Sequence, residues 1–265
     1  PHRKGRESMI KLLKCELLKV RHRYVFLTSL AIVAAGLVFS LYGNYSGTNV
    51  DFIMKNGWVM MLYQLPLANG IFFPIMATVV ASRLADAEHK ASAFKHLFTL
   101  EKREKIYDAK LIIGIVLMIL CVLIYWAVVL VFGTFIGFEG APPMGMYLRY
   151  LACVMAPTVV IYIFQHGLSM LFKNQAVSFF TGVIGTFAGL FSMFLPQLPL
   201  LRQLLPWGFY GAMQFVGLFG WTKETRYADA YFEIMPVEPY VYIIAAVYAI
   251  LFYAVGKYLF CRKEI

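Results

Sequence analysis

Six long apolar runs constrain the fold of this chain more than any other feature. Each is close to 20 residues or longer, the length that an α-helix needs to cross the ~30 Å hydrocarbon core of a bilayer. The runs occupy residues 24–42, 58–82, 111–135, 150–172, 175–195 and 239–260. Only 14% of the 265 residues are charged, whereas soluble domains average about a quarter. The sequence therefore predicts an all-α integral membrane protein with six transmembrane helices.

A seventh uncharged run, residues 203–222, is also long enough to span. It contains Pro206, four glycines and two tryptophans, a composition more typical of a segment at the membrane interface than of a straight span. We therefore expect an interfacial or re-entrant helical segment before the last transmembrane helix.

The distribution of basic residues predicts the orientation. With six spans and an internal N-terminus, Lys and Arg number 16 on the inner side, counted from Met9, and 5 on the outer side. Cytoplasmic loops of membrane proteins carry the excess of basic residues. Both termini are therefore expected in the cytoplasm. A seventh span would place the basic C-terminal tail outside, which this count disfavours.

The domain organisation is expected to be simple. Residues 1–8 precede Met9, which opens a plausible natural start, and we interpret them as a cloning remnant. Residues 9–265 show no repeat and no flexible linker, so they are expected to form a single transmembrane domain.

An amphipathic segment at residues 9–23 precedes the first span. Ile10, Leu13, Leu17 and Val20 recur at a spacing that places them on one helical face, which is typical of a helix lying in the membrane interface. Two roles are open, a topological anchor or a contact with a cytoplasmic partner. The polar residues assigned to this interface helix are Lys14, Glu16, Lys19 and Arg21.

The densest block of charge lies at residues 81–112, between the second and third spans. A helix over 86–100 would place Ala87, Ala91, Phe94 and Phe98 on one stripe, with Leu97 beside them. Apolar anchors at this spacing are typical of helices that dock in a groove of another protein. The alternative is a solvated loop whose charge only sets the orientation.

Two further groups of polar residues are candidates for function. Polar side chains within spans are costly to bury, so they mark a tentative translocation path, unless they only form hydrogen bonds between helices. These residues are Gln64, Asn69, Gln165 and His166. The outer segment 196–238 offers carboxylates that attract a basic peptide by long-range electrostatics, among aromatic residues that are otherwise interface anchors. These carboxylates are Asp229, Glu233 and Glu238.

Several function classes are excluded by absent motifs. The sequence has no GxxxxGK[ST] phosphate-binding loop, no HExxH and no GxSxG. We expect no catalytic residues, no metal site and no bound cofactor, and the basic excess lies in loops rather than in a nucleic-acid-binding patch. If the chain pumps a substrate, a separate partner must hydrolyse ATP.

The charged segment carries a resemblance to a known family. Its run Phe94-Lys95-His96-Leu97-Phe98-Thr99-Leu100, with Glu88 before it and Arg103 and Lys110 after it, resembles the cytoplasmic loop of ABC-2 type permeases. More narrowly, it is similar to permeases of bacterial lantibiotic-immunity exporters, as is Glu16-Leu17-Leu18-Lys19-Val20-Arg21 before the first span. The specific motifs cover about 35 residues. Relatives usually carry a proline after the LFTL-like run, where this chain has Glu101-Lys102.

The resemblance implies a coupling helix between the second and third spans, which docks on a separate ATP-binding subunit. The docking residues would be Glu88, Phe94, Lys95, Leu97, Phe98 and Arg103. Arg103, Lys105 and Lys110 would also link this helix to the third span or to lipid headgroups.

The resulting hypothesis is a permease subunit of an ABC exporter in the bacterial cytoplasmic membrane. It would expel a membrane-active antimicrobial peptide, a lantibiotic, and so give immunity or resistance. Its expected partners are two copies of an ATP-binding subunit that binds ATP and magnesium, a second permease, identical or related, the lipid bilayer and the peptide. Alternatives are an ABC-2 permease for a drug, ion or lipid, or a membrane anchor of a sensor complex. Extraction from the membrane and export from the cytoplasm both remain open.

Overall fold

The structure is a computed structural model of the chain. It describes residues 2–41, 50–90, 93–195, 197–224 and 227–263. For residues 2–8, Ala87, Ala93 and Lys95 it describes the backbone only.

Helices form almost all of the described chain. In chain order the elements are α1 (His2–His22), α2 (Val25–Leu41), α3 (Val50–Lys90), α4 (Ala93–Leu100), α5 (Arg103–Ile136), α6 (Met144–Leu171), α7 (Ala176–Met193), α8 (Pro199–Leu204), the 3-10 helix η1 (Pro206–Gly208), α9 (Phe209–Ala212), β1 (Val216–Phe219), β2 (Tyr231–Ile234) and α10 (Pro239–Arg262).

The predicted membrane fold is confirmed. Within the described ranges, α3, α5, α6, α7 and α10 are long and apolar enough to cross a membrane, and the bent pair α1–α2 supplies a sixth candidate. The chain turns by 59° between these two helices, where Tyr24 adopts a left-handed φ of 53°. This turn separates the amphipathic α1 from the apolar α2.

Two helices extend well beyond the predicted spans. α3 has 41 residues and α5 has 34, and at 1.5 Å per residue they measure about 60 and 50 Å. The hydrocarbon core of a bilayer is only ~30 Å thick. Both helices therefore continue into the polar regions, where both ends of α3 and the first turns of α5 carry charged residues.

The segment before the last span is not a straight transmembrane helix, and its strands were not predicted. It divides into α8, η1 and α9, and then β1 pairs antiparallel with β2 in the register Val216 to Ile234. Trp207 of η1 is buried, and it contacts the face of α7 that carries Gly185 and Gly189. These small residues allow the broken segment to pack directly on α7.

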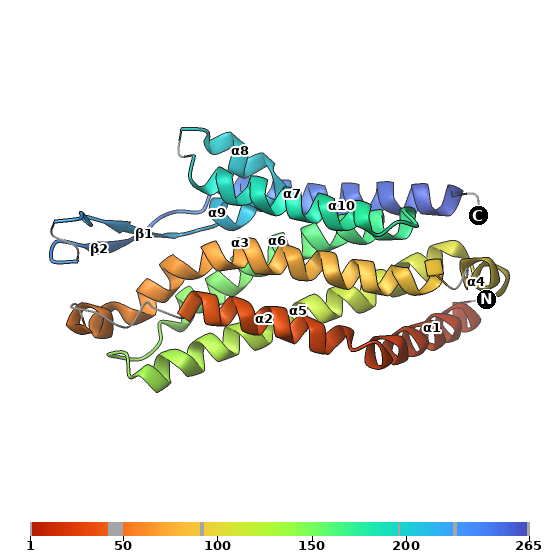
Figure 1. The fold of residues 1–265 in the computed structure, drawn as a ribbon, viewed down its shortest axis with the longest axis horizontal. Helices are drawn as coiled ribbons and strands as arrows, with labels where there is room; N and C mark the ends of the chain where they lie inside the picture. Colours follow the sequence, from red (N-terminus) through yellow and green to blue (C-terminus); the bar gives the residue numbers. More distant parts are fainter. Residues whose placement is uncertain (1, 42–49, 91–92, 196, 225–226, 264–265) are drawn as a thin grey trace.

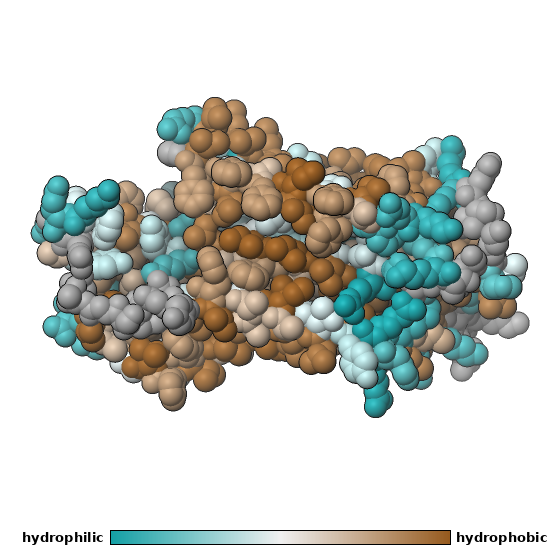
Figure 2. All heavy atoms as spheres, viewed as in Figure 1, coloured by the Kyte–Doolittle hydropathy of each residue, from teal (hydrophilic) through white to brown (hydrophobic). Residues whose placement is uncertain are grey.

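The elements are arranged along one long axis (Figure 1). Both termini, α1 and α4 lie at one end, which we call the terminal end, and the β1–β2 hairpin lies at the opposite end, the hairpin end. On the face shown in Figure 2, apolar side chains form a band across the middle, and hydrophilic residues gather beside it towards the terminal end. This distribution matches a helix bundle that spans a bilayer along its long axis.

Candidate functional site

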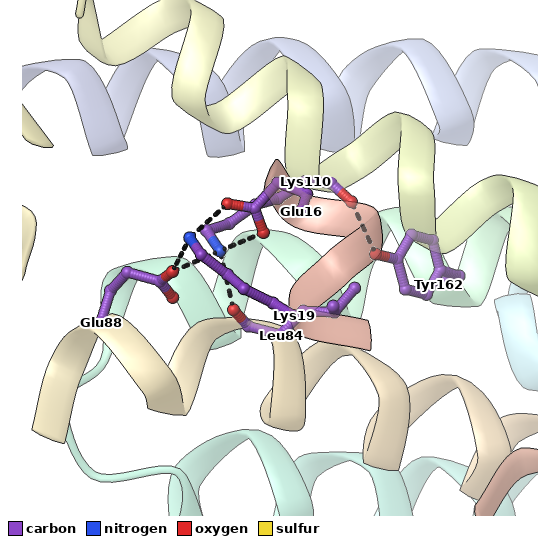
Figure 3. Close-up of polar contacts among 6 residues, drawn as sticks. All are labelled: Glu16, Lys19, Leu84, Glu88, Lys110 and Tyr162. Atoms are coloured by element: carbon purple, nitrogen blue, oxygen red, sulfur yellow. Dashed lines mark hydrogen bonds and ion pairs between the residues drawn. The ribbon is translucent and has the colours of Figure 1, made fainter. Parts of the chain in front are cut away.

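The terminal end contains a group of four buried or half-buried charges. Lys110 of α5 is fully buried and lies 2.7 Å from Glu16 of α1 and 2.9 Å from Glu88 of α3. Lys19 of α1 lies 2.7 Å from each of the same two carboxylates. Figure 3 shows how the four side chains point toward one another from three helices. We call Glu16, Lys19, Glu88 and Lys110 the charge cluster.

The charge cluster is electrostatically balanced, with two ammonium groups and two carboxylates. An isolated charge in this environment would cost several kcal/mol, and pairing with good hydrogen bonds offsets that cost. The Lys110 ammonium also donates to the Leu84 carbonyl at 3.0 Å. Burial lowers the pKa of Lys19, but hydrogen bonds and charge from Glu16 and Glu88 outweigh it and hold that pKa above its usual value. Lys19 therefore stays charged, and the ion pairs of the cluster join α1, α3 and α5.

The charge cluster also determines which face of α1 is buried. Ile10 and Leu17 were predicted to share one helical face with Val20, as in a helix lying in the membrane interface, and they are 45% and 58% exposed. Glu16 and Val20 are buried instead, because Glu16 faces Lys110. The apolar side chains on the outer face of α1 suit contact with lipid, as does the position of the helix at the end of the apolar band.

A second set of contacts surrounds α4. Phe94 is buried, with its ring 4.9 Å from that of His89 at the end of α3 and 5.6 Å from that of Phe260 near the end of α10. Phe98 lies 5.7 Å from Phe94 and 5.8 Å from Phe260, measured between ring centroids. We call Phe94, Phe98 and Phe260 the aromatic socket. It holds the inner face of α4 against α3 and α10.

Arg103, the first residue of α5, closes this arrangement. Its guanidinium carbon lies 4.5 Å from the centre of the Phe98 ring. The same guanidinium donates to the carbonyl of Cys261 at 3.0 Å and of Lys263 at 2.7 Å. Carbonyls at the end of a helix lack partners within the helix, so Arg103 caps the C-terminal end of α10 and ties it to α4.

The predicted docking residues therefore differ in burial: some are buried within the chain and others are partly exposed at its surface. Glu88 and Phe94 are buried within the chain, Leu97 and Phe98 are half-buried, and Arg103 is engaged with the end of α10. The side chain of Lys95 and the whole of Ala91 lie outside the described residues. Of the predicted helix over 86–100, α3 covers residues 86–90 and α4 covers residues 93–100, and residues 91 and 92 lie outside the described part of the chain.

The outward side of α4 carries a different set of side chains. His96, Thr99 and Leu100 are exposed, and Leu100 is 76% exposed. The sequence pattern missed them because it followed the apolar stripe, which packs against α3 and α10. The sequence feature that could have revealed this second face is Leu100 in the run Phe98-Thr99-Leu100, an apolar residue outside that stripe.

Of the other residues assigned to the interface helix, Lys14 and Arg21 are exposed. Glu16 and Lys19 instead belong to the charge cluster. Lys110, which we linked to the third span or the lipid headgroups, is buried. Lys257 of α10 forms an ion pair of 2.7 Å with Asp108 of α5.

Three of the four polar residues within the spans pack inside the chain. Asn69 donates a hydrogen bond to Tyr150, the side chains of Gln165 and Ser178 share a hydrogen bond of 2.8 Å, and His166 lies between the rings of Tyr107 and Tyr162 at 4.7 and 5.9 Å. Each connects α6 with a neighbouring helix, as helix-to-helix contacts do in membranes.

Gln64 has a different environment. It lines a groove of about 540 Å³ between α2, α3, α7 and the end of α9. Among the described residues, its buried side-chain oxygen has no hydrogen-bond partner. The groove also includes Phe39, Tyr63, Leu67 and Gln214, and so it combines apolar walls with amide groups. Such a lining fits an amphipathic molecule.

The predicted outer carboxylates lie at or beside the hairpin. Asp229, Glu233 and Glu238 are all exposed. Glu233 is in β2, opposite Gly217, and Glu238 precedes the first turn of α10. The aromatic rings of Phe219 and Tyr231 stack 5.9 Å apart on the same two strands.

Comparison with known proteins supports a membrane role for this arrangement. A protein-family model described as ABC-2 family transporter protein matches residues 12–189, which cover α2 to α6, the second half of α1 and most of α7. The chain belongs to the ABC-2 transporter family. A search of curated proteins finds no match to the sequence. The matched range contains the whole charge cluster and α4, whereas Phe260 and the hairpin lie beyond it.

Membership of the ABC-2 family carries three consequences. The chain is a multi-pass membrane protein of the transport-permease type. A permease domain of this family is the transmembrane component of a transporter and not itself the ATPase. The family also implies an ABC-type ATP-binding partner and a lipid environment.

Proposed function

We propose that this chain is the permease subunit of an ATP-driven exporter and that α4 is the helix on which the ATP-binding subunit docks. The observation that carries the proposal is the division of α4 into two faces. Its inner face is held by the aromatic socket, and its outer face presents Leu100 and His96 at the polar end of the bundle. A helix that docks in a groove of another protein contacts it with apolar side chains on one face, and Leu100 is such a side chain.

The orientation follows from the charge distribution. The terminal end carries the excess of Lys and Arg, 16 against 5 in the chain from Met9, so we place it in the cytoplasm. This places α4 on the side of the membrane where ATP is available. The hairpin end then faces outward.

The charge cluster supports a coupling role for the terminal end. α4 lies between α3 and α5, and Glu88 and Lys110 connect these two helices to each other and to α1. A movement of α4 therefore acts on more than one helix. It acts on helix ends joined by buried ion pairs, which are costly to separate.

We propose a complex of two permease subunits and two ATP-binding subunits, in which ATP and magnesium bind to the latter. The second permease is an identical or a related chain. The groove that contains Gln64 is lined by residues of α2, α3 and α7, and we assign it to the translocation path. Asn69, Gln165 and His166 are then structural rather than path-lining residues.

For the cargo we propose a cationic, membrane-active peptide of the lantibiotic type. The exposed carboxylates Asp229, Glu233 and Glu238 provide charge complementarity, and the stacked rings of Phe219 and Tyr231 provide an apolar surface beside them. A peptide embedded in the outer leaflet meets this surface first, which favours extraction from the membrane. A drug, ion or lipid is the alternative cargo, and growth in graded lantibiotic separates the two because another cargo gives no protection.

Co-purification with the ATP-binding subunit tests the docking proposal. The change Leu100→Asp places a charge on the outer face of α4, and we expect it to abolish binding. Leu204→Asp is the matched control, because Leu204 is 51% exposed in α8 and far along the chain from α4. Binding that survives Leu100→Asp would show that the subunit docks elsewhere.

A further inference from the structure

The aromatic socket makes the end of α10 a direct neighbour of α4. Phe260 is fully buried, and its ring contacts both Phe94 and Phe98. It lies two residues before the end of α10. A displacement of α4 by a docked subunit therefore presses on α10 without an intervening loop.

Arg103 strengthens the same connection from the other side. It stacks on Phe98 of α4 and donates to the carbonyls of Cys261 and Lys263 at the end of α10. Lys263 in turn donates to the Leu171 carbonyl at the end of α6, at 2.7 Å. The end of α10 is thus held by charged hydrogen bonds, which are among the stronger contacts of this kind.

α10 itself has the properties of a rigid rod. It is 24 residues long, which corresponds to about 36 Å, and its one proline, Pro239, lies in the first turn where it does not break the helix. One side packs on α6, where Gly256 and Gly167 approach closely. The other side exposes residues such as Ile243, Val247 and Ile250 to lipid.

The opposite end of α10 is attached to the hairpin. β2 ends at Ile234, and α10 begins at Pro239. Between them the Met235 amide donates to the Phe215 carbonyl at 2.8 Å, and Arg149 donates to the Met235 carbonyl at 3.3 Å. The connection is short and bonded to its surroundings, so a shift of α10 moves the hairpin.

We propose that α10 carries the movement of α4 across the membrane to the β1–β2 hairpin. Phe260 and Arg103 are the positioning residues that connect the two helices. This inference rests on the proposed function, because it requires an ATP-binding subunit that displaces α4. It adds that the last helix, and not only the helices joined by the charge cluster, receives the movement and passes it to the outer surface.

The experiment measures the response of the hairpin to nucleotide. Lys223, an exposed residue between the two strands, is replaced by Cys in the chain co-expressed with its ATP-binding subunit. Right-side-out vesicles are loaded with ATP or with ADP, and the rate of labelling by a membrane-impermeant maleimide is measured. The variants Phe260→Ala and Arg103→Gln are compared with Phe260→Tyr, which retains the ring, and with Leu259→Ala, which removes a lipid-exposed neighbour.

We expect labelling rates with ATP and ADP to differ by about tenfold when Phe260 and Arg103 are present, as for a shift between two states. Phe260→Ala and Arg103→Gln should remove this difference while the ATP-binding subunit still co-purifies and hydrolyses ATP. Phe260→Tyr and Leu259→Ala should preserve it. Arg103→Gln keeps the test valid if Phe260→Ala does not fold.

The outcomes separate the inference from the proposed function. If no ATP-binding subunit co-purifies with the unchanged socket, the proposed function itself is wrong. If the complex forms but the hairpin does not respond to ATP, or responds equally in Arg103→Gln, the role of α10 is refuted and the function stands. Loss of the response in Leu259→Ala as well would also refute it, since that change leaves the socket intact.

Discussion

The ammonium group of Lys110 lies 2.7 Å from the carboxylate of Glu16, which is 94 residues earlier in the chain. Both side chains are almost completely buried, at 0% and 3% exposed. This contact fixes α1 against α5 and turns a polar edge of α1 inward. With the pairs to Glu88 and Lys19 it joins three helices of the terminal end that are far apart in sequence.

The first prediction concerns the stability of the charge cluster. Lys110→Met leaves Glu16 and Glu88 with Lys19 as their shared cation, so we expect a loss of about 3–5 kcal/mol in the free energy of unfolding. Thermal or denaturant unfolding in detergent measures it. Adding Glu88→Gln should recover part of the loss, because the remaining Glu16 and Lys19 are again balanced.

A matched control for this prediction is Lys90→Met. Lys90 is paired with Asp86 at 2.7 Å, but its side chain is 79% exposed. Exposed pairs contribute little, so the change should stay within about 1 kcal/mol. Equal losses for the two lysines would contradict the structural role of the cluster.

A second prediction distinguishes the two faces of α4. Phe94→Ala removes a buried ring from the aromatic socket and should cost about 3–5 kcal/mol of stability. Leu100→Ala removes an exposed side chain and should change stability by less than about 0.5 kcal/mol, yet weaken binding of the ATP-binding subunit. Unfolding and binding are measured on the same preparations. If Leu100→Ala destabilises the chain as much as Phe94→Ala, Leu100 is a packing residue and not an anchor.

A third prediction concerns the contact between α7 and η1. A Cβ atom at Gly189 would lie 2.6 Å from the backbone oxygen of Trp207, so Gly189→Ala must displace η1. We expect a loss of about 1–3 kcal/mol in stability, together with increased proteolysis of the segment from Pro199 to Ala212. Gly145→Ala is the control: nothing lies within 4 Å of its Cβ position, and it should be tolerated.

The fourth prediction concerns the outer carboxylates. Replacing Asp229, Glu233 and Glu238 by their amides should lower protection against a cationic peptide by about three- to tenfold. The effect should be smaller at high salt, because salt screens the attraction between exposed charges. Growth in graded peptide measures it. Glu139→Gln changes an exposed acid in the α5–α6 loop and should have little effect. Undiminished protection by the triple variant would exclude the hairpin as the site of first contact.

The sequence predicted the membrane spans well because length and composition of an apolar run are local properties. A run of about 20 apolar residues can satisfy its backbone in a bilayer only as a helix, whatever it packs against. α5 and α10 appear where the runs 111–135 and 239–260 predict them, with longer ends. The family resemblance also came from local motifs, and the family match over residues 12–189 confirms its ABC-2 part.

The β1–β2 hairpin illustrates what local patterns do not contain. Each strand has four residues. The two strands are separated in the sequence by a connection whose composition is typical of a loop. The hairpin is held by tertiary packing, since Phe232 of β2 contacts the rings of Phe52 and Tyr63 from α3. No periodicity in either strand signals that support.

The sequence by itself determined the class of fold, the positions of the candidate spans and the polar ends, because these depend on transfer of side chains between water and lipid. Only the tertiary structure decided which face of each amphipathic helix is buried. Phe94 turns inward because Phe260 fills the space beside it, and Glu16 turns inward because Lys110 needs a carboxylate. Both partners lie far away in sequence, so the same amphipathic pattern is compatible with either face until the helices meet.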